Sequence, residues 1–165
     1  MGNAILYRMA AGIPGAVNRV EHATVVPEVI DSGTPPTKFG IFVKMVTGKI
    51  QPLASSDAGS VVYGLLVRPF PTSGNGTDGL GTSTPATSGI CDVLKRGYIM
   101  ATLALGTAAK NGAVYVVTTA GGTVVVGDIV TSTSPAGGGT AVAVTGAFFT
   151  GPADANGIVE IAYNI

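Results

Sequence analysis

The rest of the chain is arranged around residues 61–105, which read VVYGLLVRPFPTSGNGTDGLGTSTPATSGICDVLKRGYIMATLAL. This stretch holds two apolar, strand-like runs, one at 61–68 and a second at 90–94 and 97–105. Between them, residues 71–89 consist almost wholly of Gly, Ser, Thr and Pro. Loops longer than about 12–15 residues without structure of their own are uncommon in compact domains, and they are usually functional or disordered. We therefore expect residues 71–89 to form a long surface loop that contacts a partner.

The rest of the chain after residue 36 shows the period-2 alternation of β-strands, interrupted by Gly-rich turns. No stretch longer than a turn or two, at Asp92–Arg96, suits a helix. Eight to ten short strands predict one all-β domain over residues 37–165, a jelly-roll-like β-sandwich or barrel. Besides the two runs above, strands are expected at 39–46, 50–53, 113–117, 123–126, 141–149 and 158–165, with 113–126 as a hairpin.

Residues 1–36 have neither a helical nor a strand period. They combine apolar residues and arginines with recurrent prolines, and the residue before each proline favours extended backbone. This composition predicts an extended N-terminal arm whose apolar side chains add to the sheet edge or fill the pockets of a neighbour. A loosely packed terminal segment is the alternative.

Composition favours a protein that is covered by partners. Among 165 residues, 11% are charged, against about 25% in ordinary globular domains, and 46% are apolar. Large exposed apolar patches usually mark interfaces. A β-protein coated with Ser and Thr and simply soluble is the alternative. The formal net charge is zero, without a run of either sign, so we expect no nucleic-acid partner. We expect no membrane partner, because no apolar run approaches 20 residues, and no export signal, which implies synthesis in the cytoplasm.

Patterns that would support catalysis are weak. Cys91 and His22 are the sole cysteine and histidine, so a nucleophilic pair would need the two to meet, and a multi-histidine metal site is excluded. Residues 74–79 match G-x-G-x-x-G, but Thr-Ser-Thr-Pro follows where a nucleotide site needs a helix. We therefore expect no enzyme, no catalytic or metal-binding residues and no cofactor.

Four segments taken in order carry a resemblance to a known family: YRMAAGIPGAVNR (7–19), YGLLVRPFP (63–71), GLGTSTP (79–85) and FTGPADANG (149–157). Together they resemble the structural cement proteins of tailed-bacteriophage heads, of the type seen in Bordetella phage. The resemblance implies a jelly-roll-like domain on the exterior of the phage head, bound to HK97-type capsid subunits. It also implies many copies in each virion, and contacts between neighbouring major capsid proteins that are stabilised without catalysis.

The leading hypothesis is therefore a capsid decoration protein with two partners, the major capsid protein and further copies of itself in a dimer or trimer. Its expected interface residues are Tyr7, Arg8, Ile13, Val17, Arg19, Arg68, Phe70 and Leu80. A receptor-binding or tail protein is the main alternative, although the long loop carries no aromatic residue that would favour glycan capture. A β-fold hydrolase that uses Cys91 and His22 is the second alternative.

Overall fold

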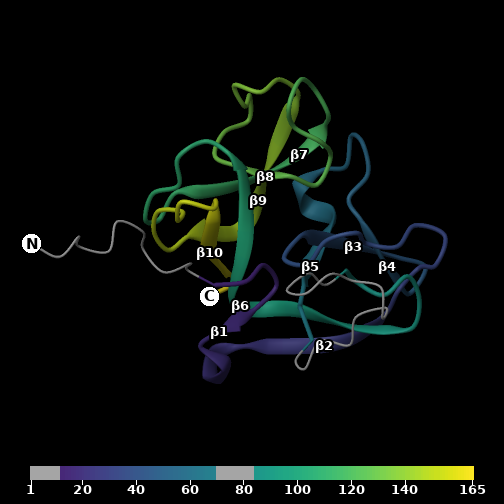
Figure 1. Cartoon of the computed structure of the whole chain (residues 1–165). Helices are drawn as coiled ribbons and strands as arrows, with labels where there is room; N and C mark the ends of the chain where they lie inside the picture. The colour runs from purple at the N-terminus through teal and green to yellow at the C-terminus, as the bar shows by residue number, and fades with distance from the viewer. Residues whose placement is uncertain (1–11, 70–83) are drawn as a thin grey trace, which may run out of the picture.

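The computed structural model describes residues 12–69 and 84–165. Ten strands form one continuous sheet, and two short 3₁₀ turns are the helical elements of the described residues (Figure 1). The all-β prediction is confirmed, as is the prediction of a barrel-like single domain. The strands are β1 (Val17–Asn18), β2 (Thr24–Val29), β3 (Phe42–Val46), β4 (Lys49–Pro52), β5 (Val62–Leu66), β6 (Ile90–Leu105), β7 (Ala113–Thr119), β8 (Ile129–Val130), β9 (Thr140–Phe149) and β10 (Ile158–Tyr163), and the 3₁₀ turns are η1 (Val20–His22) and η2 (Gly59–Val61).

Strand β6 organises the sheet because its two halves pair with different partners. Its first half lies between β2 and β5, and its second half pairs with β10 on one side and with β1 and β8 on the other. Figure 1 shows a bend between the two halves of β6. Gly97 has φ +134°, and a Cβ there would lie 3.0 Å from Ala23 Cα. A residue without a side chain is therefore needed where β6 turns.

The second half of β6 belongs to a closed ring of five strands. The hydrogen-bonded order is β6–β10–β9–β7–β8 and back to β6, with β8 parallel to β6 and every other pair antiparallel. We call this the first ring. Alternate residues such as Ile99, Ala101 and Leu103 join the largest buried core, together with Val159 and Ile161 from β10. The period-2 pattern in the sequence reflects this one-sided burial.

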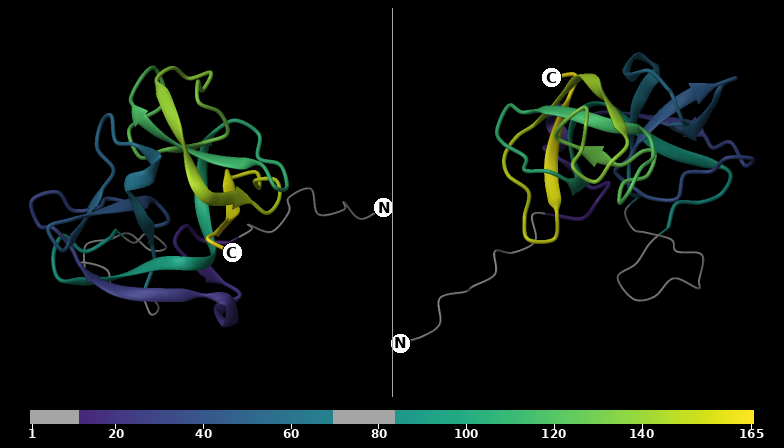
Figure 2. Two further views of the ribbon diagram at one scale, coloured as in Figure 1. Left: turned by 180° about the vertical axis from the view of Figure 1, so that it is seen from behind. Right: turned by 90° about the horizontal axis from the view of Figure 1, so that it is seen from above.

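The first half of β6 belongs to a second ring, ordered β2–β6–β5–β3–β4. It is completed by a parallel bridge between Ile30 and Ile50. Its own core consists of Ile30, Val43, Ile50, Leu66 and Val93. The left view of Figure 2 shows β3–β5 on one side of the molecule and β7–β10 on the other, with β6 between them.

The two rings pack against each other. Phe42 of β3 and Leu65 of β5 face the first-ring core, whereas their neighbours Val43 and Leu66 face the second-ring core. Because Phe42–Val43 and Leu65–Leu66 are buried on both faces of their strands, each of these pairs is apolar at consecutive positions. The ring of Phe42 meets Tyr163 of β10 edge-on at 6.1 Å between centroids.

Three local predictions were wrong. Residues 92–96 are strand, not a helical turn, because both edges of β6 are paired there. Residues 123–126 lie in a turn that contains an isolated bridge between Gly121 and Val124, and the antiparallel partners of β7 are β8 and β9. Residues 17–18 and 24–29 of the expected arm are strands of this chain's own sheet, while residues 1–11 lie outside the described part.

Candidate interaction site

The two residues considered for nucleophilic catalysis lie apart. His22 is exposed in η1, before β2, whereas Cys91 pairs in register with Glu28 near the other end of that strand. At about 3.3 Å of rise per residue they are separated by roughly 15–20 Å. Burial, with the nearby charges of Asp92 and Glu28, raises the pKa of the Cys91 thiol to about 11. A thiol that stays protonated at neutral pH is a poor nucleophile.

No three His, Cys, Asp or Glu side chains within residues 12–69 and 84–165 are grouped as metal ligands. Over the same residues, no helix is long and apolar enough to cross a membrane. What the described residues do offer is surfaces for contact.

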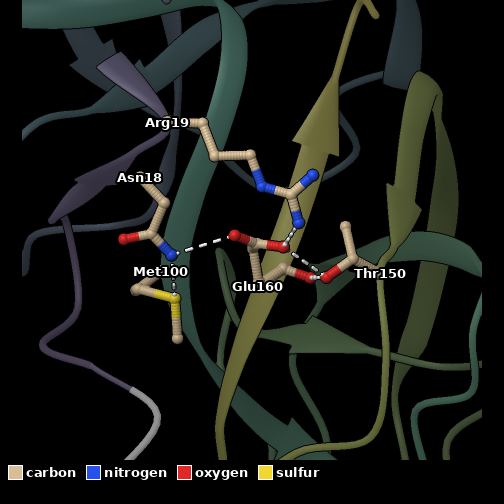
Figure 3. Close-up of polar contacts among 5 residues, drawn as sticks. All are labelled: Asn18, Arg19, Met100, Thr150 and Glu160. Atoms are coloured by element: carbon tan, nitrogen blue, oxygen red, sulfur yellow. Dashed lines mark hydrogen bonds and ion pairs between the residues drawn. The ribbon is translucent and has the colours of Figure 1, made fainter. Parts of the chain in front are cut away.

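Arg19 lies in a polar cluster that fastens β1 to the first ring (Figure 3). Its guanidinium Nη2 donates to Glu160 Oε2 at 2.9 Å, and Asn18 Nδ2 donates to Glu160 Oε1 at 2.9 Å. The Thr150 hydroxyl donates to Glu160 Oε2 at 2.6 Å. Glu160 is 16% exposed and Arg19 49% exposed, so the carboxylate is the partly buried centre of the cluster. Arg19 also covers the ring of Tyr98 at 4.0 Å.

Val17, another expected interface residue, is half-buried. It pairs with Ile99 and packs against the first-ring core. Val17 and Arg19 therefore both have contacts within the chain, which sequence reasoning did not foresee.

The segment that contains Ile13 is hydrogen-bonded to Arg68, although 55 positions separate the two residues in the sequence. The backbone N–H of Arg68 donates to Gly15 O at 2.8 Å, and the N–H of Gly15 donates to Met100 O at 2.7 Å. Ile13, two residues before Gly15, is 53% exposed. The Arg68 guanidinium lies 5.9 Å from the centre of the Phe39 ring. Among the described residues, no carboxylate forms an ion pair with Arg68.

A half-open cavity of about 530 Å³ adjoins this point, between the two rings. We call it the seam groove. Lys38 reaches across it, with its Nζ 3.8 Å from Asp128 Oδ1. The groove is lined by Pro14, Thr37, Lys38, Phe39, Gly40, Ile41, Arg68, Thr102, Ala104, Gly127, Asp128 and Ile129. Apart from Arg68, none of these was expected from the sequence, because the groove joins segments that are far apart in the chain.

Other exposed apolar side chains lie along β2 and at the start of β6. Val25 and Val29 are exposed on β2, and Ile90, paired with Val29, is 74% exposed. Pro27, between the two valines, lacks a backbone N–H, and proline is typical of open sheet edges, where it hinders strand addition. Tyr7, Arg8, Phe70 and Leu80 lie outside the described residues, as do residues 71–83 of the long loop.

An all-β domain with exposed apolar side chains and a groove has surfaces suited to contact with other proteins. Comparison with known families shows to which family it belongs. The family described as "Structural cement protein (E217 gp24/Pam3 gp6)" matches residues 1–164. The chain belongs to this family of phage structural cement proteins, as the sequence predicted, and it is therefore a structural, capsid-associated protein of the virion.

A solved structure has the same fold. A chain from "The capsid of Myoviridae Phage XM1" superposes with a TM-score of 0.69 at 23% sequence identity, covering 99% of this chain and 97% of that one. None of the curated proteins matches the sequence.

Proposed function

We propose that this protein binds the exterior of an HK97-type capsid, stabilises contacts between major capsid protein subunits, and does so without catalysis. Family membership supports the general role, and the similar structure comes from a phage capsid. The molecular proposal rests on exposed Ile13, whose segment is hydrogen-bonded to Arg68 through Gly15, and on the Arg68 guanidinium, which has no carboxylate ion-pair partner among the described residues. Arginine is enriched at binding hot spots.

The individual contacts are weak in isolation, and repetition compensates for this. A specific interface buries around 1,600 Å² in total, and many copies on a symmetric shell gain avidity without new contacts. The low charge of the chain, 11%, reduces the cost of removing its surface from water. We also propose self-association as a dimer or trimer, in which exposed aliphatic residues of β2 and β6 are covered. Sedimentation velocity of the purified protein over a concentration series tests that association.

The decisive experiment is co-sedimentation of the purified protein with mature shells that lack it. Binding should saturate at a fixed ratio to capsid subunits, and decorated shells should survive a higher temperature than bare shells. Failure to bind mature shells would contradict the proposal and favour a receptor-binding or tail role.

The role of the N-terminal segment needs a deletion that stops before Gly12. Val17 and Asn18 pair with β6, so removing them would damage the sheet as well as any interface. Deletion of residues 1–11, which include Tyr7 and Arg8, should weaken shell binding while the domain unfolds at an unchanged temperature. Unchanged affinity would exclude the proposed role of this segment.

A further inference from the structure

We infer that the seam groove binds an extended, acidic and aliphatic segment of the neighbouring shell subunit. This inference rests on the proposed function, and it assigns the recognition step to a site that the family membership does not identify.

The groove is large enough to hold side chains of a bound segment. Its volume of about 530 Å³ falls within the range of 300–1,000 Å³ typical of ligand clefts. The floor is apolar, with Ile129 2% exposed and Phe39 and Ile41 half-buried. The outer face of β6 contributes Thr102 and Ala104, which are small residues, and Ala104 is exposed. A floor of this kind accepts an aliphatic side chain, while the open side leaves room for the backbone that carries it.

The charges of the groove select an acidic occupant. Lys38 and Arg68 supply two positive charges, against one negative charge from Asp128. Asp128 is already engaged, because its Oδ2 accepts the Val125 N–H at 2.9 Å and its Oδ1 lies 3.8 Å from Lys38. Arg68 has a neighbouring aromatic ring but no carboxylate among the described residues. A partner carboxylate at Arg68 would form the bidentate pair that a guanidinium favours.

The groove is also rigid enough to be preformed. Gly40, which lines it, has φ +74°, and a Cβ there would lie 2.8 Å from both Gly15 N and Met100 O. The backbone N–H of Gly40 donates to Leu66 O at 2.9 Å. Close backbone packing on both sides holds the two rings in a fixed relation, so binding requires little ordering of the groove itself.

Two substitutions test the inference by different means. Arg68→Glu reverses a charge that has no carboxylate ion-pair partner among the described residues, and Ala104→Trp fills the groove from an exposed position. Their matched controls are Lys110→Glu and Ala120→Trp, which place the same residues at exposed positions outside the groove. Each variant is first shown to have the unfolding midpoint of the unchanged protein, and then titrated onto shells that lack the protein.

Binding should fall at least tenfold for Arg68→Glu or for Ala104→Trp, and stay within about twofold of the unchanged protein for both controls. If the unchanged protein binds shells but both groove variants bind equally well, the groove inference is wrong and the proposed function stands. If the unchanged protein fails to bind, the proposed function itself fails. Should Ala104→Trp not fold, Arg68→Glu decides alone.

A photoreactive residue at position 104 identifies the occupant. Irradiation of decorated shells, followed by mass spectrometry, should locate the cross-link on a shell-subunit peptide that holds an aliphatic residue beside Asp or Glu. A cross-link confined to a second copy of this chain, or to a peptide without an acidic residue, would overturn the inference.

Discussion

The two rings share β6 but are closed in different ways. In the first ring every junction is a ladder between named strands. In the second ring, the junction between the β2 segment and β4 consists of the Ile30–Ile50 bridge and a hydrogen bond from Asp31 N–H to Ile50 O at 3.0 Å. The first ring is therefore held mainly by its sheet and core, and the second depends more on local polar contacts.

Several of those polar contacts join β2, β5 and β6 of the second ring. The Tyr63 hydroxyl donates to Glu28, which connects β5 with β2 across β6. Lys95 Nζ donates to the Tyr63 backbone O at 2.6 Å and lies 3.2 Å from the centre of the Tyr63 aromatic ring. Burial lowers the pKa of Lys95, opposed by the charge of Glu28. We therefore expect the first ring to be the more rigid of the two units that share β6.

The largest expected effect compares two isoleucines, both 0% exposed. Ile99→Ala in the first ring should cost about 4 kcal/mol of unfolding free energy, and Ile50→Ala in the second about 2–3 kcal/mol. The cost is smaller at Ile50 because a site beside an incomplete ladder can collapse around the cavity. Urea unfolding of both variants measures the difference. A larger loss for Ile50→Ala would show that the second ring is the tighter one.

The next comparison concerns two glycines with similar φ but different surroundings. Gly40 at the seam has φ +74°, and an added Cβ would lie 2.8 Å from backbone atoms, whereas Gly48 in the β3–β4 turn has φ +76° and nothing within 4 Å. Gly48→Ala should cost about 1 kcal/mol for the left-handed conformation alone. Gly40→Ala should cost roughly 2–3 kcal/mol, because backbone must also move. Thermal unfolding of both variants measures the difference. Equal losses of stability would mean that the backbone around Gly40 moves at little cost.

How far the sequence predicted this molecule depends on how local the signal is. Strands β3, β9 and β10 could be predicted from the period-2 pattern of apolar residues, which is a signal local to each strand. Residues 92–96 could not be assigned correctly, since Lys95 is satisfied by Tyr63, a residue 32 positions away. Among the expected interface residues, Ile13 and Arg68 adjoin the seam groove. Lys38 and Ala104 were missed because they line the groove together with residues far away in the sequence, and no sequence pattern predicts such a contact.

A third prediction compares the polar cluster on each ring. Glu160→Ala should cost about 1.5–3 kcal/mol, because it leaves the Asn18 amide and the Thr150 hydroxyl without their charged acceptor. Tyr63→Phe in the second ring should cost about 1 kcal/mol, since it removes one hydroxyl and keeps the aromatic ring. Arg19→Ala, at a half-exposed position, should cost less than about 1 kcal/mol. Chemical denaturation of the three variants checks this order, and a dominant effect of Arg19→Ala would contradict it.

The smallest expected effect is a pH dependence confined to the second ring. Hydrogen bonds from the Gly33 N–H and from Gln51 hold the pKa of Asp31 below its usual 3.8. At Asp57, burial raises the pKa, but hydrogen bonds from Lys44 and the Ala54 N–H outweigh it, so that the pKa of Asp57 is also lowered. A carboxyl whose folded pKa is depressed contributes stability above its unfolded pKa, and this contribution is lost as the pH falls through the folded value.

Both carboxyls belong to the second ring: Asp31 follows the closing bridge, and Asp57 pairs with Lys44 of β3 at 2.8 Å. Below about pH 4, amides of β3 and β4 should therefore lose hydrogen-exchange protection earlier than those of β9 and β10. The double variant Asp31→Asn, Asp57→Asn should exchange at these amides with little dependence on pH over the same range. If protection in both rings falls together in the unchanged protein, then β6 couples them too strongly for either to open alone, and the distinction between a rigid and an adjustable ring fails.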